Sequence, residues 1–202
     1  MTAVEANDFL QNKTPLEKFA EWLKEAQSTS LKQPDAFTLC TLTADSKPRS
    51  RIVLVKEIRD VGIVFFTNYK SMKGRDLERT PYASANFYWD TLFRQVNFQG
   101  EVSRLSRAES EAYWATRPRL SQLAQWVSQQ SEPVDSRKKM EEELAAADQK
   151  FLGTSVPCPI HWGGYLLSPT KVEFWQGREG RFHDRYSYQK VENQWRGQRL
   201  YP

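Results

Sequence analysis

Five short runs decide the fold of this chain: AFTLCTL at residues 36–42, SRIVLVKEI at 50–58, GIVFFTN at 62–68, ASANFYW at 83–89 and RQVNFQGEVSRL at 94–105. Each run is rich in β-branched or aromatic residues, which favour strands. Between them, DSKP at 45–48 and RDVG at 59–62 are typical of hairpin turns. Five neighbouring strands with short turns predict an antiparallel meander that curls into a barrel.

Helix signals flank these strands on both sides. TPLE at residues 14–17 is a capping box with proline at the first helical position, which predicts a helix to about residue 28. SRAE at 106–109 is a second capping box, before a helix that ends ahead of Pro118. A helical pattern follows at 120–129, and a charged helix is expected from Asp135 or Ser136 to about Leu152. Strand patterns return at residues 164–168, 171–176, 186–191 and 194–199.

These elements predict one domain. Residues 1–13 are polar and are expected to form a mobile segment, and residues 14–202 are expected to form a single mainly β domain with flanking helices, an α+β fold. The chain has no repeat, linker or low-complexity tract that would divide it.

The composition excludes several classes of protein. Two cysteines and two histidines among 202 residues argue against a disulfide scaffold and against a metal site, so no metal is predicted. No apolar run has transmembrane length, and residues 1–12 lack the pattern of a targeting peptide, so a cytoplasmic protein without a membrane partner is expected. The net charge of +4 fits a phosphorylated ligand, but acidic residues interrupt the basic stretches, and nucleic-acid binding is not expected.

Motifs for common chemistries are missing as well. The sequence has no Walker-type phosphate loop, no dinucleotide fingerprint and no Gly-x-Ser-x-Gly elbow. What remains is a set of cationic and amide side chains in four clusters, which lie on or beside the predicted strands and helices.

The first two clusters lie on neighbouring strands. Arg51 and Lys56 bracket an apolar stretch, and strand alternation puts Arg51, Val53 and Val55 on one face and Ile52, Leu54 and Lys56 on the other. Such a strand can bind a phosphate and a ring heteroatom, although its ends more often simply reach solvent. Next, Phe66-Thr67-Asn68 leads into Ser71-Met72-Lys73-Gly74-Arg75, where a helix begins. This arrangement suits phosphate, and an ordinary solvated turn explains it equally well.

The other two clusters come later in the chain. Tyr113 and Arg117 are four residues apart and are expected to share a helix face near Ser121, which suits a small aromatic phosphate; a tyrosine packed on the core is the commoner alternative. Arg181, His183 and Arg185 alternate, so an extended segment would point all three the same way. Three such groups would repel one another unless an anion lies among them, so this cluster favours a binding site.

Taken together, nine runs carry a resemblance to a known family. They are Arg51-Ile52-Val53-Leu54-Val55-Lys56, Phe66-Thr67-Asn68, Arg94-Gln95-Val96, Thr116-Arg117-Pro118, Trp126-Val127-Ser128, Gln130-Ser131, Trp162-Gly163-Gly164, Glu173-Phe174-Trp175-Gln176-Gly177 and Arg181-Phe182-His183-Asp184-Arg185. In order and spacing, from about Leu16 to Pro202, the chain resembles the pyridoxine/pyridoxamine 5′-phosphate oxidase family.

The resemblance implies an FMN-binding split β-barrel that forms a homodimer, with FMN at the interface. It implies cofactor contacts from Arg51, Ile52, Val53, Leu54, Val55, Lys56, Phe66, Thr67, Met72, Lys73, Gln95, Gln130, Ser131, Trp175 and Arg185. Substrate contacts would come from Lys56, Tyr113, Arg117, Ser121, Arg181 and His183, with Arg181 and His183 as the catalytic pair. The implied reaction converts pyridoxamine or pyridoxine 5′-phosphate to pyridoxal 5′-phosphate while O2 becomes H2O2.

The sequence departs from the family pattern in places. Met72 stands where the family usually has arginine, Ala124-Gln125 replaces Gly-Ala, Phe182 replaces leucine, and Asn7-Asp8-Phe9-Leu10 replaces a basic segment. Two alternatives therefore stay open. One is a related flavin split-barrel oxidase on another substrate, such as a phenazine-pathway oxidase. The other is a catalytically poor protein that binds FMN or pyridoxal phosphate.

Overall fold

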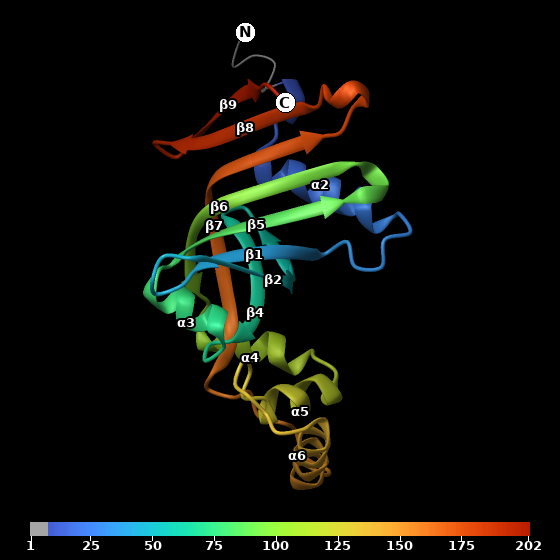
Figure 1. The fold of residues 1–202 in the computed structure, drawn as a ribbon, viewed down its shortest axis with the longest axis vertical. Helices are drawn as coiled ribbons and strands as arrows, with labels where there is room; N and C mark the ends of the chain where they lie inside the picture. Colours follow the sequence, from blue (N-terminus) through green and yellow to red (C-terminus); the bar gives the residue numbers. More distant parts are fainter. Residues whose placement is uncertain (1–7) are drawn as a thin grey trace.

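A strongly curved antiparallel sheet forms most of the computed structural model, which describes residues 8–202 (Figure 1). In this part of the chain the strands are β1 (Ala36–Leu42), β2 (Pro48–Leu54), β3 (Glu57–Arg59), β4 (Gly62–Asn68), β5 (Tyr82–Trp89), β6 (Arg94–Arg104), β7 (Trp162–Gln176), β8 (Asp184–Val191) and β9 (Gln194–Leu200). Their order is β2-β1-β5-β6-β7-β4-β3, with β8 beside β7 and β9 beside β8.

The antiparallel sheet predicted from the sequence is confirmed, but its connections differ from a simple meander. β4 pairs with the first half of β7, about 100 residues later, so the sheet path ends in β2 and β3 and does not close. Residues 50–58, predicted as one strand, split into β2 and β3, because the N–H groups of Val55 and Lys56 turn to the carbonyls of Asp35 and Val64.

The opposite difference occurs in β7. Residues 164–168 and 171–176, predicted as two strands, form one strand that runs through Pro169. Proline has no N–H for the ladder, and β6 shifts register between Gln99 and Gly100 at the same place. β7 therefore extends from the helical end of the molecule to the β8–β9 end (Figure 1).

Within residues 8–202 the helices of eight residues or more are α2 (Pro15–Gln27), α3 (Met72–Arg79), α4 (Arg107–Ala115), α5 (Arg119–Val127) and α6 (Arg137–Lys150). Both predicted capping boxes are present, at Thr14 with Glu17 and at Ser106 with Glu109. Figure 1 shows α4, α5 and α6 gathered at one end of the molecule, while α2 lies against the sheet near the other end.

Two apolar clusters hold these elements together. In the larger one, Phe19 of α2 is fully buried, with its ring 4.7 Å from that of Phe87 and 4.8 Å from that of Phe98. Burying an aromatic side chain of this kind contributes about 1.5–3 kcal/mol. In the second cluster, Trp114 packs edge-on against Trp162, with 4.8 Å between the rings, which ties α4 to the first residue of β7.

The N-terminal segment that was expected to be mobile lies partly outside the described residues, which begin at residue 8. Within the described part, Phe9 stacks on Tyr186 of β8 at 4.3 Å, and Leu10 is buried. No helix in residues 8–202 is long and apolar enough to cross a membrane.

Candidate functional site

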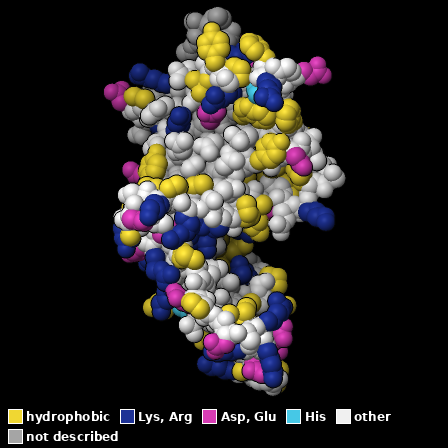
Figure 2. Space-filling model, in the orientation of Figure 1, with side chains coloured by type: hydrophobic (Ala, Val, Ile, Leu, Met, Phe, Trp, Pro, Cys, Tyr) yellow, Lys and Arg dark blue, Asp and Glu magenta, His cyan; other side chains and the backbone are white. Residues whose placement is uncertain are grey.

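Cationic side chains gather where α3 begins, between the sheet and the end of the molecule formed by α4, α5 and α6 (Figures 1 and 2). Strand alternation puts Arg49 and Arg51 on one face of β2, toward α3. Ser71 caps α3 by accepting the N–H of Gly74 at 3.3 Å. A side chain at Gly74 would place its Cβ 2.1 Å from the carbonyl oxygen of Tyr69, so only glycine allows α3 to start this close to β4.

Lys73 is the first cation of this cluster. Its Nζ lies 3.1 Å from Oε1 of Gln130, 3.3 Å from Oγ1 of Thr67 and 3.4 Å from Oγ of Ser71. Within residues 8–202 it pairs with no carboxylate. Burial, reinforced by the charge of Arg51, lowers the pKa of Lys73 to about 8. An anion at this position would reverse that shift.

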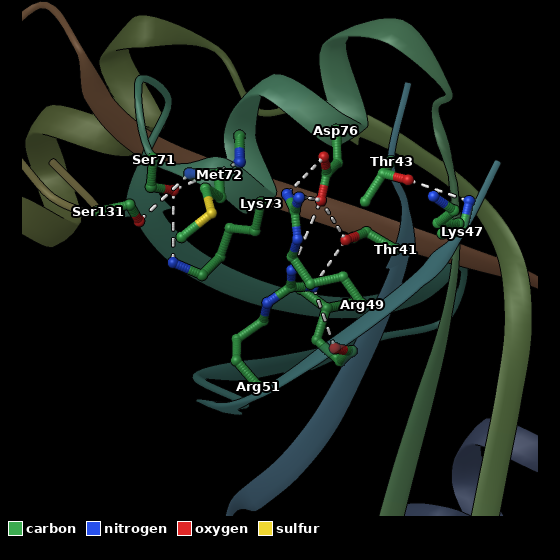
Figure 3. Close-up of polar contacts among 12 residues, drawn as sticks. Thr41, Thr43, Lys47, Arg49, Arg51, Ser71, Met72, Lys73, Asp76 and Ser131 are labelled. Atoms are coloured by element: carbon green, nitrogen blue, oxygen red, sulfur yellow. Dashed lines mark hydrogen bonds and ion pairs between the residues drawn. The ribbon is translucent and has the colours of Figure 1, made fainter. Parts of the chain in front are cut away.

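Arg51 is the second cation and carries an unused donor. Its Nη1 donates to Oγ1 of Thr41 at 2.7 Å and to the carbonyl of Leu39 at 3.2 Å (Figure 3). Its Nη2 is buried and has no hydrogen-bond partner among the described residues. The distance from Nη2 to Oδ2 of Asp76 is 3.5 Å, which makes an ion pair. Burial lowers the pKa of Arg51, which nonetheless stays protonated.

The cluster has an excess of positive charge. Arg49 donates through Nη1 to both oxygens of Asp76, at 3.0 and 3.2 Å. Arg49 and Arg51 share the carboxylate of Asp76, and Lys73 has no carboxylate partner among the described residues, so the three cations and one carboxylate leave a net charge of about +2. A half-buried +2 cluster with an unpaired guanidinium nitrogen fits a phosphate dianion, such as the one that FMN carries.

The other residues predicted for this region make separate contacts. Ser131 accepts the N–H of Met72 at 3.3 Å and so joins the loop after α5 to α3. Lys56 instead pairs with Asp35, 3.1 Å away. On β2, Ile52 is 64% exposed and Val53 and Leu54 are half-buried. Val55, just after β2, places its side chain in the core.

Tyr113 and Arg117 meet around an aromatic stack, beside α5 with its half-buried Ser121. The ring of Tyr113 stacks on that of Phe66 at 3.9 Å, and the guanidinium of Arg117 lies 5.0 Å from the ring of Trp162. Tyr113 and Arg117 were expected to lie on one face of a single helix. In the structure only Tyr113 lies in α4, because α4 ends at Ala115 and Arg117 follows it. The Nε of Arg117 is buried without a partner among the described residues, and burial lowers its pKa.

A third group lies at the other end of β7. The ring of His183 is 4.6 Å from that of Trp175, and its Nδ1 accepts the N–H of Arg178 at 3.1 Å. Gln95 of β6 pairs with Trp175 across the sheet. Arg185 is held by Glu173, 2.8 Å away, and by the carbonyl of Tyr201 at 3.1 Å.

The extended conformation expected for residues 181–185 is wrong. Residues Glu179–Arg181 form a tight turn in which Gly180 and Arg181 have φ of 64° and 59°. β8 begins only at Asp184. The three side chains therefore do not line one face, and Glu173 already neutralises Arg185.

Within one protomer the two ends do not meet. Trp162 and Trp175 are the neighbours of Arg117 and His183, and they lie 13 residues apart on β7. At about 3.3 Å per residue this is about 40 Å along the strand. The predicted residues thus form two groups. The phosphate-type half contains Lys73 and Arg51 near α3, with Tyr113 and Arg117 near α4. The ring-type half contains Trp175 with its neighbours Gln95 and His183.

The cavities beside the loop after α5 do not contain the cations of the phosphate-type half. Two cavities, of about 690 and 520 Å³, flank the loop after α5, and Gln130 lines both. Arg51, Lys73 and Arg117 line neither of them. The cationic cluster therefore lies outside these two cavities.

Two models of known protein families match this chain, one after the other. The model of pyridoxamine 5′-phosphate oxidase matches residues 23–150, and that of the pyridoxine 5′-phosphate oxidase C-terminal dimerisation region matches residues 162–202. The chain belongs to the pyridoxamine 5′-phosphate oxidase family. The family expected from the sequence is thus confirmed, and β7, β8 and β9 make up the family's dimerisation region.

Individual relatives agree. The chain is 47% identical to a pyridoxine/pyridoxamine 5′-phosphate oxidase of Cyanothece sp., over 93% of this chain and 88% of that protein. It is 46% identical to the one of Rubrobacter xylanophilus, over 93% and 87%. Among solved structures, PhzG from Burkholderia lata in complex with tetrahydrophenazine-1-carboxylic acid has a TM-score of 0.89 at 30% identity, over 93% of this chain and 92% of that one. An FMN-binding protein from Nostoc punctiforme shares the fold, with a TM-score of 0.76 at 17% identity over 95% of this chain and 99% of that one.

Three residues at the site were missed by the sequence prediction. Asp76 and Thr41 bind the predicted Arg51, and Arg49 shares its carboxylate partner. Arg49 had a signal, because it lies two residues before Arg51 on the same strand face. Asp76 had none, since it is a single acidic residue in a helix that is far from β2 in the sequence.

Proposed function

We propose that this chain is an FMN-dependent oxidase that converts pyridoxamine 5′-phosphate and pyridoxine 5′-phosphate to pyridoxal 5′-phosphate, with O2 reduced to H2O2. The observation that carries the proposal is the +2 cluster of Arg49, Arg51 and Lys73, with a buried guanidinium nitrogen left unpaired. It fits the phosphate of FMN, in a chain of this family at 47% identity to a named oxidase.

The FMN site is proposed to draw on both chains of a homodimer. Arg51, Thr67 and Lys73 would hold the phosphate end, beside Gln130 and Ser131. The partner would supply the ring-type half with its own copies of Gln95, Trp175 and Arg185. Support comes from the separation of the two halves along β7 and from the match of residues 162–202 to a dimerisation region.

The substrate phosphate is assigned to Tyr113, Arg117 and Ser121. The guanidinium of Arg117 lies over Trp162, and its buried Nε offers a hydrogen bond that no described residue takes. A bound phosphate would take it and offset the cost of burying that group. Lys56, which Asp35 now holds, would lie between the two ligands.

When bound, FMN supplies the acceptor for a hydride from the substrate carbon and passes the electrons to O2. The chain's own contribution is to orient the substrate ring through Arg181 and His183. Because Nδ1 of His183 accepts a backbone N–H, the neutral imidazole carries its proton on Nε2. His183 is therefore set to donate a hydrogen bond from Nε2 to a ring substituent.

The test is an anaerobic visible spectrum of FMN-reconstituted protein, before and after pyridoxine 5′-phosphate is added. Bleaching of the oxidised flavin band, its return in air and the appearance of H2O2 are expected. Arg117→Met, with the same FMN content, is the matched control and should bleach slowly.

Other outcomes select the alternatives. Flavin that binds but never bleaches with either B6 substrate contradicts the proposal and favours a binding protein. Bleaching with a reduced phenazine carboxylic acid alone favours the phenazine-type oxidase, for which the fold similarity to PhzG is the supporting observation. The cytoplasmic location expected from the sequence stays a prediction.

A further inference from the structure

A buried carboxylate lies behind the cationic cluster. The side chain of Asp76 on α3 is only 6% exposed. Its Oδ2 accepts the hydroxyl of Thr41 at 2.7 Å, and both of its oxygens accept Nη1 of Arg49. Burying a carboxylate is costly unless it is paired and hydrogen-bonded, so these donors hold Asp76 in one place.

The hydroxyl of Thr41 links Asp76 to Arg51. An ionised carboxylate can only accept hydrogen bonds, so the hydroxyl proton of Thr41 points to Asp76. The lone pairs of Oγ1 are then left for Nη1 of Arg51, which donates to them at 2.7 Å. One edge of the guanidinium is fixed in this way, and Nη2 stays without a hydrogen bond among the described residues.

We propose that Asp76 is a positioning residue of the FMN phosphate site: through Thr41 it orients the free Nη2 of Arg51, and it holds Arg49 as a further cation of that site. The proposal rests on the proposed function, since it takes the phosphate of FMN as the anion. Arg49 uses only Nη1 for Asp76, and its side chain is 37% exposed, so its other nitrogens remain available.

The geometry separates this role from simple competition between Asp76 and the phosphate. The 3.5 Å ion pair between Asp76 and Nη2 of Arg51 lacks hydrogen-bond geometry, so the carboxylate attracts Nη2 without using its N–H. Arg49 and Arg51 are two residues apart on one strand face and repel each other. The Asp76 carboxylate forms an ion pair with each guanidinium and so lowers that repulsion (Figure 3).

The experiment compares FMN with riboflavin, which has the same ring system and no phosphate. Binding of each flavin is measured by quenching of flavin fluorescence in the full-length protein, for wild type, Asp76→Asn, Thr41→Val and Arg49→Gln. Asp76→Asn and Thr41→Val should raise the Kd for FMN about tenfold or more, and Arg49→Gln about threefold or more. The Kd for riboflavin should stay within about twofold of wild type.

Two neighbouring residues provide matched controls. Thr43, two residues after Thr41, bonds to Asp45 instead, and the exposed Lys47 pairs with Asp45. Thr43→Val repeats the change made at Thr41, and Lys47→Gln replaces a nearby cation with glutamine as Arg49→Gln does; both should leave the two affinities unchanged (Figure 3).

Two results would overturn the proposal. Equal or tighter FMN binding by Asp76→Asn would show that the carboxylate only competes with the phosphate. A parallel loss of FMN and riboflavin would show that Asp76 merely supports α3. If Asp76→Asn does not fold, Thr41→Val decides alone, because it keeps both the charge and the side-chain shape. Wild type that binds no FMN refutes the proposed function too, whereas unaffected variants of an FMN-binding wild type refute only the positioning role.

Discussion

Alkaline solution is expected to weaken FMN binding to this protein, because one cation of the phosphate site loses its proton unusually early. Lys73 has a pKa lowered to about 8, by burial and by the charge of Arg51. Above that pH the free protein loses a positive charge at the site. Binding a phosphate must then return a proton to Lys73, which costs affinity.

The structure sets an upper limit on this cost. The drop in the pKa of Lys73 from its ordinary value of 10.5 to about 8 corresponds to about 3 kcal/mol, at about 1.36 kcal/mol for each tenfold change in proton affinity. Lys73 is partly reached by solvent, which screens the interaction, so about 1–2 kcal/mol is the expected part. The Kd for FMN should accordingly rise about 5- to 30-fold between about pH 7 and about pH 9.5.

Stability of the protein without FMN should respond in the opposite direction. Between pH 8 and 10.5 the unfolded chain keeps the proton on Lys73 while the folded chain has lost it. The unfolded state then binds more protons, so the contribution of Lys73 to the free energy of unfolding rises with pH in this interval. Phosphate raises the pKa again, so FMN affinity falls over the same interval.

The assay is an FMN titration by fluorescence quenching across this pH range, with riboflavin as the reference for ionisation of the flavin ring. Lys73→Arg keeps its charge throughout and should show a flat profile, whereas Lys70→Arg, at an exposed neighbouring position, should keep the wild-type slope. A flat wild-type profile, or a wild-type slope in Lys73→Arg, would refute the reasoning.

Three further predictions concern single side chains. Arg117→Lys should raise the KM for pyridoxine 5′-phosphate about tenfold or more and leave FMN affinity unchanged, because lysine lacks the planar guanidinium that lies over Trp162. The measurement is steady-state kinetics at saturating FMN, and an unchanged KM would contradict the prediction. Gly74→Ala should lower both the unfolding temperature and FMN affinity, because its Cβ would meet the backbone of Tyr69 and displace Lys73; normal calorimetry and titration would count against it. Met72→Arg should tighten FMN by about 1.5–3 kcal/mol through a new charge-assisted contact, and an unchanged Kd would show that the cationic cluster is already sufficient.

Local features of the fold were predictable from sequence. Both capping boxes act between residues three apart, and β1 and β4 have the bounds that their apolar runs indicate. The pairing of β4 with β7 was not predictable, because it joins segments about 100 residues apart and depends on how the whole sheet packs.

The candidate site divides in the same way. Lys73, Thr67 and Gln130 were predicted as FMN contacts, through the family resemblance, and the structure brings them within hydrogen-bond distance of one another. Their assignment to FMN remains a proposal. The segment around His183 was predicted wrongly as extended, because strand alternation was given more weight than Gly180, whose freedom at positive φ permits the turn.

The length of β7 has a genetic consequence. Each protomer carries a phosphate-type half near Trp162 and a ring-type half near Trp175, and on the proposed arrangement each of the two sites of a dimer takes one half from each chain. A dimer of two different mutants, one damaged in each half, would place both defects in one site and leave the other intact. Alleles with lesions at opposite ends of this strand would therefore complement each other in one cell, while alleles with lesions at the same end would not.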